Sequence, residues 1–169
     1  MKKSSIKLVV LFVTLFFVAG VLSAGSIANQ TVLYTVPAIY EIAVTGAPTL
    51  TIAAPAAGAL PTEVTDSTSA KYAITTNGSG LKITGKLADA MPTGVILKIN
   101  IANPTTGLPT SDVTFTAATA VDLVTGVTQI AASNLAITYK LSTTLAAVVV
   151  SSSKVVTLTI TDTANTVFP

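Results

Sequence analysis

The sequence of 169 residues contains no cysteine, histidine or tryptophan, and all nine of its basic residues are lysines. Without cysteine there is no disulfide framework, thiolate metal site or thiol nucleophile, although an oxidising compartment suits such a chain. Without histidine, catalytic triads built on that residue are excluded, because no side chain exchanges protons as readily near neutral pH. Without arginine, the chain lacks the planar guanidinium group that binds phosphates and guanine edges through paired hydrogen bonds. We therefore predict no enzyme, no catalytic residue and no nucleic-acid partner.

Charge is also scarce. Charged residues make up 9% of the chain and hydrophobic residues 50%, whereas a usual soluble domain is about one quarter charged. The formal net charge of +2 depends on three lysines in the first seven residues, ahead of a long apolar run. The surface must therefore be covered largely by threonine, serine, alanine and asparagine. Threonine is β-branched and carries a hydroxyl, so it suits the solvent face of a sheet and favours strands over helices.

The first residues have the pattern of a secretory leader. The basic pair Lys2-Lys3 precedes an uncharged apolar run over residues 8–22, and small residues follow at 23–25. We assign residues 1–24 as a signal peptide, with cleavage between residues 24 and 28, and predict a secreted or cell-surface protein with no membrane span in the mature form. The alternative is a retained signal anchor, because the apolar run approaches the roughly 20 residues that cross a bilayer.

Beyond the leader, apolar residues recur at every second position, which is the period of a β-strand. Residues 156–161 show it most clearly, because Val156, Leu158 and Ile160 alternate with threonines. That segment should have one aliphatic face and one hydroxyl-covered face. Residues 95–101 and 135–141 follow the same pattern. We predict strands at all three.

Shorter segments between glycines and prolines are further strand candidates; they are residues 31–36, 40–44, 49–52 and 112–116. Asn77-Gly78-Ser79-Gly80 predicts the tight turn of a hairpin between residues 72 and 87. Residues 53–60 and 117–130 lack a clear period and could be bulged strands, loops or helical turns. The predicted fold is a single all-β, immunoglobulin-like or pilin-like antiparallel sandwich over residues 37–169, preceded by an extension or donor strand at 25–36.

The seven carboxylates are scattered and lie mostly beside turns, where solvated positions are the interpretation that we favour. No cofactor is predicted. In the absence of cysteine and histidine, a metal would need hard oxygen ligands, which leaves a structural Ca²⁺ as the candidate. Glu63 and Asp66, or Asp112, could contribute to such a site. Our default prediction is that no metal binds.

Two asparagines, Asn29 and Asn77, match the acceptor pattern for N-glycosylation. The pattern is short enough to arise by chance in a chain rich in serine and threonine. We interpret both matches as coincidence and keep them as candidate modification sites.

The N-terminal segment Thr31-Val32-Leu33-Tyr34-Thr35-Val36 has strong strand propensity and is followed by Pro37, which can separate it from its own sheet. Together with the leader, the cysteine-free, threonine-rich sandwich and the ending at residues 155–161, it resembles secreted prokaryotic fibre subunits, the pilin-like proteins joined by donor-strand exchange. The resemblance covers the whole mature chain. The sequence departs from chaperone-assisted pilins in lacking the disulfide that these often carry.

The resemblance implies a homopolymer of this chain, assembled with or without envelope machinery. Val32, Tyr34 and Val36, or Leu33 on the alternate face, would then fill a groove in the next subunit. Head-to-tail repetition of that contact yields a fibre.

The alternative is that residues 31–36 form the first strand of their own sandwich. The protein would then be a monomeric cell-surface or secreted module for binding or adhesion. Sugar-binding faces usually display aromatic platforms, and this chain has no tryptophan and four tyrosines.

Overall fold

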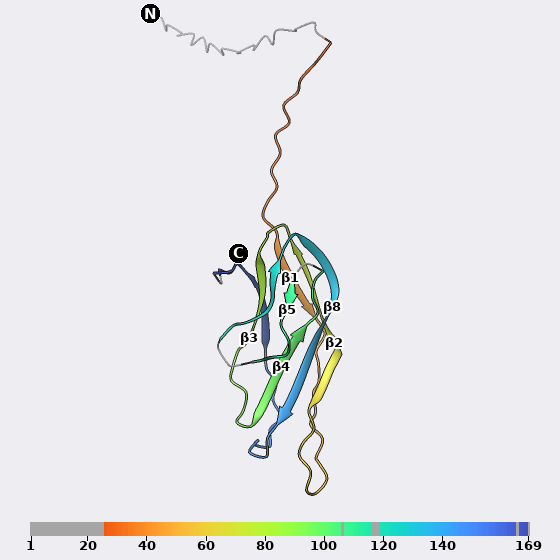
Figure 1. Ribbon diagram of the computed structural model, residues 1–169, viewed down its shortest axis with the longest axis vertical. Helices are drawn as coiled ribbons and strands as arrows, with labels where there is room; N and C mark the ends of the chain where they lie inside the picture. Colours follow the sequence, from red (N-terminus) through yellow and green to blue (C-terminus); the bar gives the residue numbers. More distant parts are fainter. Residues whose placement is uncertain (1–25, 106, 116–118, 165, 169) are drawn as a thin grey trace, which may run out of the picture. The chain divides into compact units, whose positions relative to one another are not determined.

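The structure is a computed structural model that describes residues 26–105, 107–115, 119–164 and 166–168. The predicted signal peptide, residues 1–24, lies outside the described residues. Within them the chain forms nine strands and no helix, and thus no helix that could cross a membrane. The strands make two antiparallel sheets packed against each other, which confirms the predicted all-β sandwich (Figure 1). By packing, the chain divides into two units between Thr35 and Val36.

The sandwich consists of a five-stranded and a four-stranded sheet. The five-stranded sheet has the order β1 (Tyr40–Thr45), β2 (Val64–Thr76), β8 (Ile130–Thr143), β4 (Val95–Ile101) and β6 (Val113–Thr114). The four-stranded sheet has the order β5 (Leu108–Pro109), β7 (Val121–Val127), β3 (Leu81–Leu87) and β9 (Val156–Thr161). Every pairing between neighbouring strands is antiparallel.

The core lies between the sheets and is filled by every second side chain of the long strands. Ile74 and Ile137 of one sheet and Ile83 of the other are almost completely buried. Tyr72 is also buried and donates its hydroxyl proton to the carbonyl of Ala102. Burial raises the pKa of Tyr139 to about 12, since the charged phenolate is poorly solvated there. These two tyrosines are therefore core residues whose hydroxyl groups are hydrogen-bonded or partly exposed to solvent.

The predicted hairpin at Asn77-Gly78-Ser79-Gly80 is wrong. The turn is present, but β2 belongs to the five-stranded sheet and β3 to the four-stranded sheet, so the two strands do not pair. Gly80 has a φ of +67°, and its N–H donates to the Thr128 hydroxyl at 3.1 Å. Both strands carry an apolar face, and the connection lets these faces meet across the core. Turn chemistry alone does not distinguish that arrangement from a hairpin.

Two short strand predictions are also wrong. Residues 31–36 and 49–52 carry no strand. Leu50 and Ile52 are nevertheless half-buried between exposed threonines, so the predicted apolar face exists without a hydrogen-bonded neighbour. The candidate at 112–116 is reduced to the two residues of β6, with Thr116 outside the described residues.

The aperiodic segment at 117–130 contains β7, one of the bulged strands that the sequence left open. Its register against β3 shifts between Ile83 and Thr84, which pair with Val124 and Asp122. Leu123 and Val124 are consequently both buried. A bulge puts two residues opposite one and breaks the two-residue period, which explains why periodicity did not identify this strand.

A second bulge interrupts β2 between Asp66 and Ala70, opposite Tyr139 and Ile137. Asp66 Oδ1 accepts hydrogen bonds from the backbone N–H groups of Thr68 at 2.9 Å and Ser69 at 3.0 Å. Gly46, at the end of β1, has a φ of +88°, and a Cβ there would lie 1.8 Å from the Ser69 carbonyl oxygen. Only glycine tolerates both conditions, so Gly46 is required for the chain to leave β1 past this bulge.

Candidate assembly surface

The apolar side chains of the N-terminal segment are exposed. Residues 26–39 carry no strand, and Val32, Leu33, Tyr34 and Val36 are 73%, 95%, 82% and 70% exposed. A run of large apolar residues with strand propensity is rarely left in water unless another surface covers it. These four residues were the candidates predicted from the sequence, and whether a second copy covers them remains a prediction.

Asn77 fastens the chain immediately after this segment. Its Oδ1 accepts the N–H of Ile39 at 2.9 Å, and its Nδ2 donates to the carbonyl of Pro37 at 2.8 Å. The Asn77 N–H also donates to the Ile39 carbonyl at 3.3 Å. We call residues 37–39 held by Asn77 the latch. The latch fixes the point at which the sandwich begins. Residues 26–36, which precede the latch in the described chain, have no strand partner.

Strand β9 has an open edge. Its one ladder is with β3, where Val156 pairs with Leu87 and Leu158 with Gly85. Ala88 N–H donates to the Val155 carbonyl at 3.0 Å, so that pair is a hydrogen-bonded one. Because the two kinds of pair alternate in an antiparallel ladder, Val156 and Leu158 belong to non-bonded pairs, and their N–H and C=O groups point away from β3. The open edge of β9 therefore offers donors and acceptors at these two residues.

The other edge strands differ from β9 in charge or cover. Strand β1 carries the exposed Glu41, while the edge strands β6 and β5 are only two residues long and β5 contains Pro109. Charges, prolines and short covering strands are the usual devices that keep an edge from pairing with another chain. Residues 156–161 have no charge and no proline. Among the described strands, β9 is the least protected edge.

The C-terminal residues cover the far end of β9. Thr161 forms an isolated antiparallel bridge with Val167, and Asp162 Oδ1 accepts the N–H groups of Ala164 at 2.9 Å and Thr166 at 2.8 Å. The hydrogen bonds from Thr166 lower the pKa of Asp162 below its usual value, because they favour the ionised form. This turn limits the open edge to the half of β9 that begins at Val156.

Phe168 follows that turn and stacks on Tyr40, with ring centroids 3.8 Å apart. Tyr40 opens β1, the edge strand of the other sheet, and β1 and β9 contact each other. The ring pair thus joins the two sheet edges at one end of β9. At the other end, Val44 of β1 is 48% exposed and Val156 is only half-buried.

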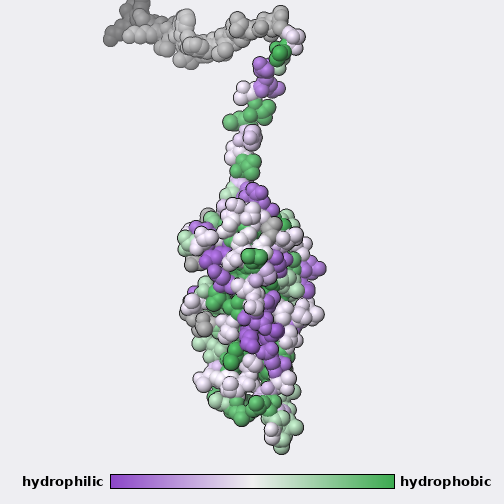
Figure 2. Space-filling model, in the orientation of Figure 1, coloured by the Kyte–Doolittle hydropathy of each residue, from purple (hydrophilic) through white to green (hydrophobic). Residues whose placement is uncertain are grey.

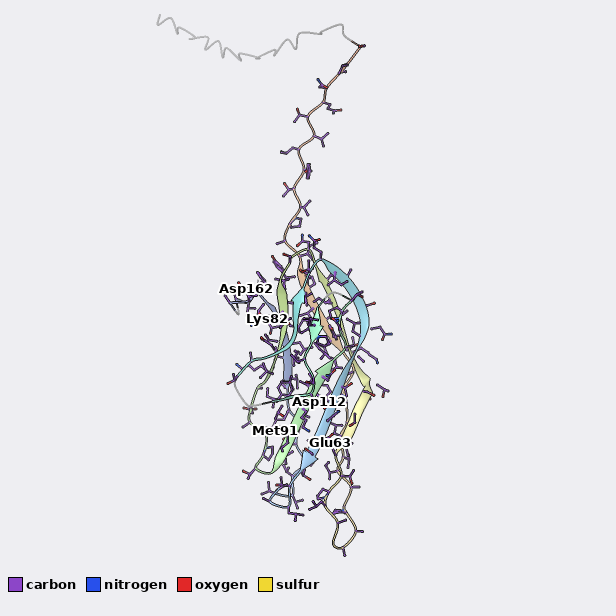
Figure 3. All side chains as sticks on the ribbon, viewed as in Figure 1. Glu63, Lys82, Met91, Asp112 and Asp162 are labelled. Carbon is purple, nitrogen blue, oxygen red and sulfur yellow. The ribbon has the colours of Figure 1, made fainter. Side chains whose placement is uncertain are left out.

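Two of the candidate calcium ligands, Glu63 and Asp112, are each paired with a lysine. Glu63 pairs with Lys98 at 3.1 Å, and Asp112 pairs with Lys140. In Figure 3, Glu63 and Asp112 lie in the same part of the sandwich, and both carboxylates raise the pKa of Lys140, Asp112 through its hydrogen bond and Glu63 through its charge. No group of three potential metal-binding side chains occurs among the residues that the structure describes. Whether calcium binds stays a prediction, and each of these two carboxylates has a structural partner.

Asp66, the remaining candidate ligand, caps the bulge in β2. Hydrogen bonds from Ser69, through its side chain and backbone, and from Thr68 lower the pKa of Asp66 to about 2. Its carboxylate therefore stays ionised while it serves two backbone donors. The sequence did not predict this role, although an aspartate followed by serine and threonine is a common signal for such a turn.

The outer face of the five-stranded sheet has a shallow depression of about 280 Å³. Small side chains create it: Ala43 and Ala73 form part of its lining, with Ser133 and Asn134 at a bulge in β8. Lys71 is the charged side chain in its lining. A lone lysine in an open depression provides no acid–base pair and no built ligand site.

The structure places the two candidate glycosylation sites in different settings. Asn29 lies in the exposed N-terminal segment. Asn77 uses both ends of its amide in the latch, so a sugar on Nδ2 would have to share that nitrogen with the bond to Pro37. Modification of either residue remains a prediction.

Comparison with known proteins gives no relative: no family model matches the chain, and no curated protein and no solved structure matches it significantly.

Proposed function

We propose that this protein is a structural subunit of an extracellular fibre, in which residues 31–36 of one copy add as a strand to the open edge of β9 in the next. The observation that carries the proposal is the coexistence of an exposed, strandless, strand-prone segment with an unprotected sheet edge. Main-chain hydrogen bonds to Val156 and Leu158 would provide the attachment, and alternate side chains would provide specificity.

The face that enters the neighbour is the one with Val32, Tyr34 and Val36. These three side chains share one face of an extended segment, and Leu33 lies between two threonines on the other. The half-buried Val156 and the exposed Val44 mark the apolar corner between β9 and β1 that this face would cover. Burial of one such side chain contributes about 1.5–3 kcal/mol.

An antiparallel orientation of the added strand is favoured because antiparallel ladders are slightly more stable per residue than parallel ones. In that orientation Val36 lies near Val156, where β9 begins, and Thr31 lies toward the Thr161 end. Since each copy donates one segment and accepts another, the contact is head-to-tail and propagates into a filament.

The second candidate function is a monomeric cell-surface or secreted binding module. It is favoured by the completeness of the sandwich, whose core is closed by the chain's own strands. On this account the exposed segment would be a tether rather than a strand donor. The two functions differ in what substitutions in residues 31–36 do to assembly.

Two matched variants test the proposal by negative-stain electron microscopy of the purified mature chain. Tyr34→Asp places a charge on the inserted face and should abolish filaments, because an aspartate cannot be buried without a partner. Thr35→Asp places the same charge one residue away, on the solvent-facing side, and should leave filaments intact. Deletion of residues 25–36 should give a folded monomer.

Filaments formed equally by both variants would show that the segment does not insert in this register. A wild-type chain that stays monomeric at high concentration would favour the binding module instead.

A further inference from the structure

The turn that carries the latch contains an asparagine followed by a glycine, and no other asparagine in the sequence precedes a glycine. Asn77 is needed because it holds the latch. Gly78 does not have a positive φ, so the turn conformation does not require it. Packing does, because a Cβ there would lie 2.8 Å from Tyr40 Cε1 and 2.9 Å from Leu81 Cδ1. Two separate contacts therefore fix this pair of residues.

An asparagine followed by glycine is chemically labile in water. The backbone nitrogen of Gly78 can attack the side-chain carbonyl carbon of Asn77, because a glycine has no side chain to obstruct the approach. The new N–C bond closes a succinimide ring, and the side-chain nitrogen of Asn77 leaves as ammonia with the proton of the Gly78 N–H. Water then opens the ring at either carbonyl and produces aspartate or isoaspartate. Asparagine is counted among the thermolabile residues.

In the closed latch both reacting groups are engaged elsewhere. Asn77 Oδ1 accepts the N–H of Ile39, and Asn77 Nδ2 donates to the carbonyl of Pro37. The Gly78 N–H donates to the Thr76 hydroxyl at 3.0 Å. The latch holds both ends of the amide, so rotation of the Asn77 side chain toward the Gly78 nitrogen would break these bonds.

The latch lies at the surface, where it can open alone. Residues 26–38 and Asn77 are exposed, and Figure 2 shows the residues ahead of the latch in single file. The water that opens the ring therefore has access to the site. Local opening of so few residues costs much less free energy than unfolding of the sandwich. The latch can thus open while the core stays closed.

We propose that Asn77 is a self-modification site that the latch controls. An open latch frees the amide for succinimide formation, and the product makes the opening permanent. Aspartate has a carboxylate oxygen where Nδ2 was the donor, so it cannot donate a hydrogen bond to the Pro37 carbonyl. Isoaspartate also lengthens the backbone of the turn, which is incompatible with the close fit of Gly78 against Tyr40. This chemistry does not depend on strand addition.

The rate of modification is the first test. The free peptide of residues 72–82 gives the reference rate, because Asn77 is its single asparagine and trypsin releases the same peptide from the chain. Both are incubated at mildly alkaline pH, and isoaspartate in this peptide is measured by mass spectrometry. It should accumulate at least about tenfold more slowly in the folded chain, because both side-chain bonds of Asn77 must break first.

A matched pair of variants tests whether the latch is responsible. Ile39→Pro removes the N–H that Asn77 Oδ1 accepts, and it should raise the rate about threefold to tenfold, as expected for the loss of one hydrogen bond. Thr35→Pro introduces the same residue ahead of the latch and should leave the rate unchanged. Slow exchange of the Ile83 amide in the same samples checks that the sandwich stays folded in both variants.

The permanence of the opening is tested on the isoaspartate form of the wild-type chain, separated by ion exchange through its added charge. Chymotrypsin should cut this form after Tyr40 about threefold or more faster than the unmodified chain, because the bond to Pro37 is lost. Tyr34 is the internal control. It is 82% exposed in the unmodified chain, so cleavage after it should be equally fast in both forms.

Three results would overturn the proposal. Modification of the folded chain as fast as the free peptide would show that the latch gives no control. Equal rates in Ile39→Pro and Thr35→Pro would show that the turn alone protects Asn77. Equal cleavage after Tyr40 in both forms would show that the latch closes again on the modified residue. None of these results bears on filament formation, which Tyr34→Asp tests separately.

Discussion

Residues 31–36 and 156–161 have nearly the same pattern, yet only the second segment is a strand. Both place three apolar side chains on one face and mostly threonine on the other. Ile160 is 4% exposed in β9, whereas Tyr34 is 82% exposed in the N-terminal segment. Alternation determines which face must be covered, and a neighbouring strand determines whether it is. The difference is the reason for proposing that a second copy supplies the missing neighbour.

The largest expected effect is a difference in stability between a substitution in residues 156–161 and one in residues 31–36. Ile160→Ala should lower the free energy of unfolding by about 2–5 kcal/mol, because it leaves a cavity in the core. Val32→Ala should change it by less than about 0.5 kcal/mol, because the side chain is exposed in the isolated subunit. Urea unfolding of the Tyr34→Asp chain, kept monomeric by that substitution, provides the measurement.

A comparable loss of unfolding free energy in Ile160→Ala and Val32→Ala would contradict this difference between the two segments. It would mean that residues 31–36 pack on their own sandwich in solution, as expected if they were its first strand.

A smaller effect concerns the hydroxyl row of β9. Thr161 is 3% exposed and its Oγ1 finds no hydrogen-bond partner among the described residues. Thr161→Val should therefore raise the free energy of unfolding by about 1 kcal/mol, since the buried hydroxyl is desolvated without compensation. Thr157→Val, at an exposed position of the same strand, is the matched control and should be nearly neutral. A destabilised Thr161→Val would show that the hydroxyl has a partner.

The sequence predicted the long regular strands because their periodicity is local. β4, β9 and residues 135–141 of β8 follow uninterrupted alternation, and the sandwich follows from several such strands with turns between them. The hydroxyl row of β9 was predicted to face solvent throughout, and it does so at Thr157 but not at Thr161. The difference arises because Val167 folds back on Thr161, which the pattern of the strand itself does not contain.

The errors all involve a partner distant in sequence. The turn at residues 77–80 was visible, but whether β2 and β3 pair depends on β8 and β9, which follow much later in the chain. The segment 31–36 has the propensity of a strand but no neighbour within its own chain. The bulges next to Asp66 and Val124 shift the period because each inserts unpaired residues into one strand of a ladder, and the ladder partner lies far away in the sequence.

The candidate site was predictable in part. Its candidate donor segment, residues 31–36, was predicted from propensity and Pro37, because both are local. The latch at Asn77 was not, since an asparagine before glycine is equally expected in an ordinary turn.

Amide hydrogen exchange in assembled filaments tests the central claim most directly. The N–H groups of Val156 and Leu158 point away from β3 and should exchange quickly in the Tyr34→Asp monomer. In wild-type filaments they should become strongly protected, together with those of residues 31–36, while Ile83 in the covered strand β3 stays protected in both. Filaments in which the amides of Val156 and Leu158 exchange as fast as in the monomer would contradict strand addition at β9.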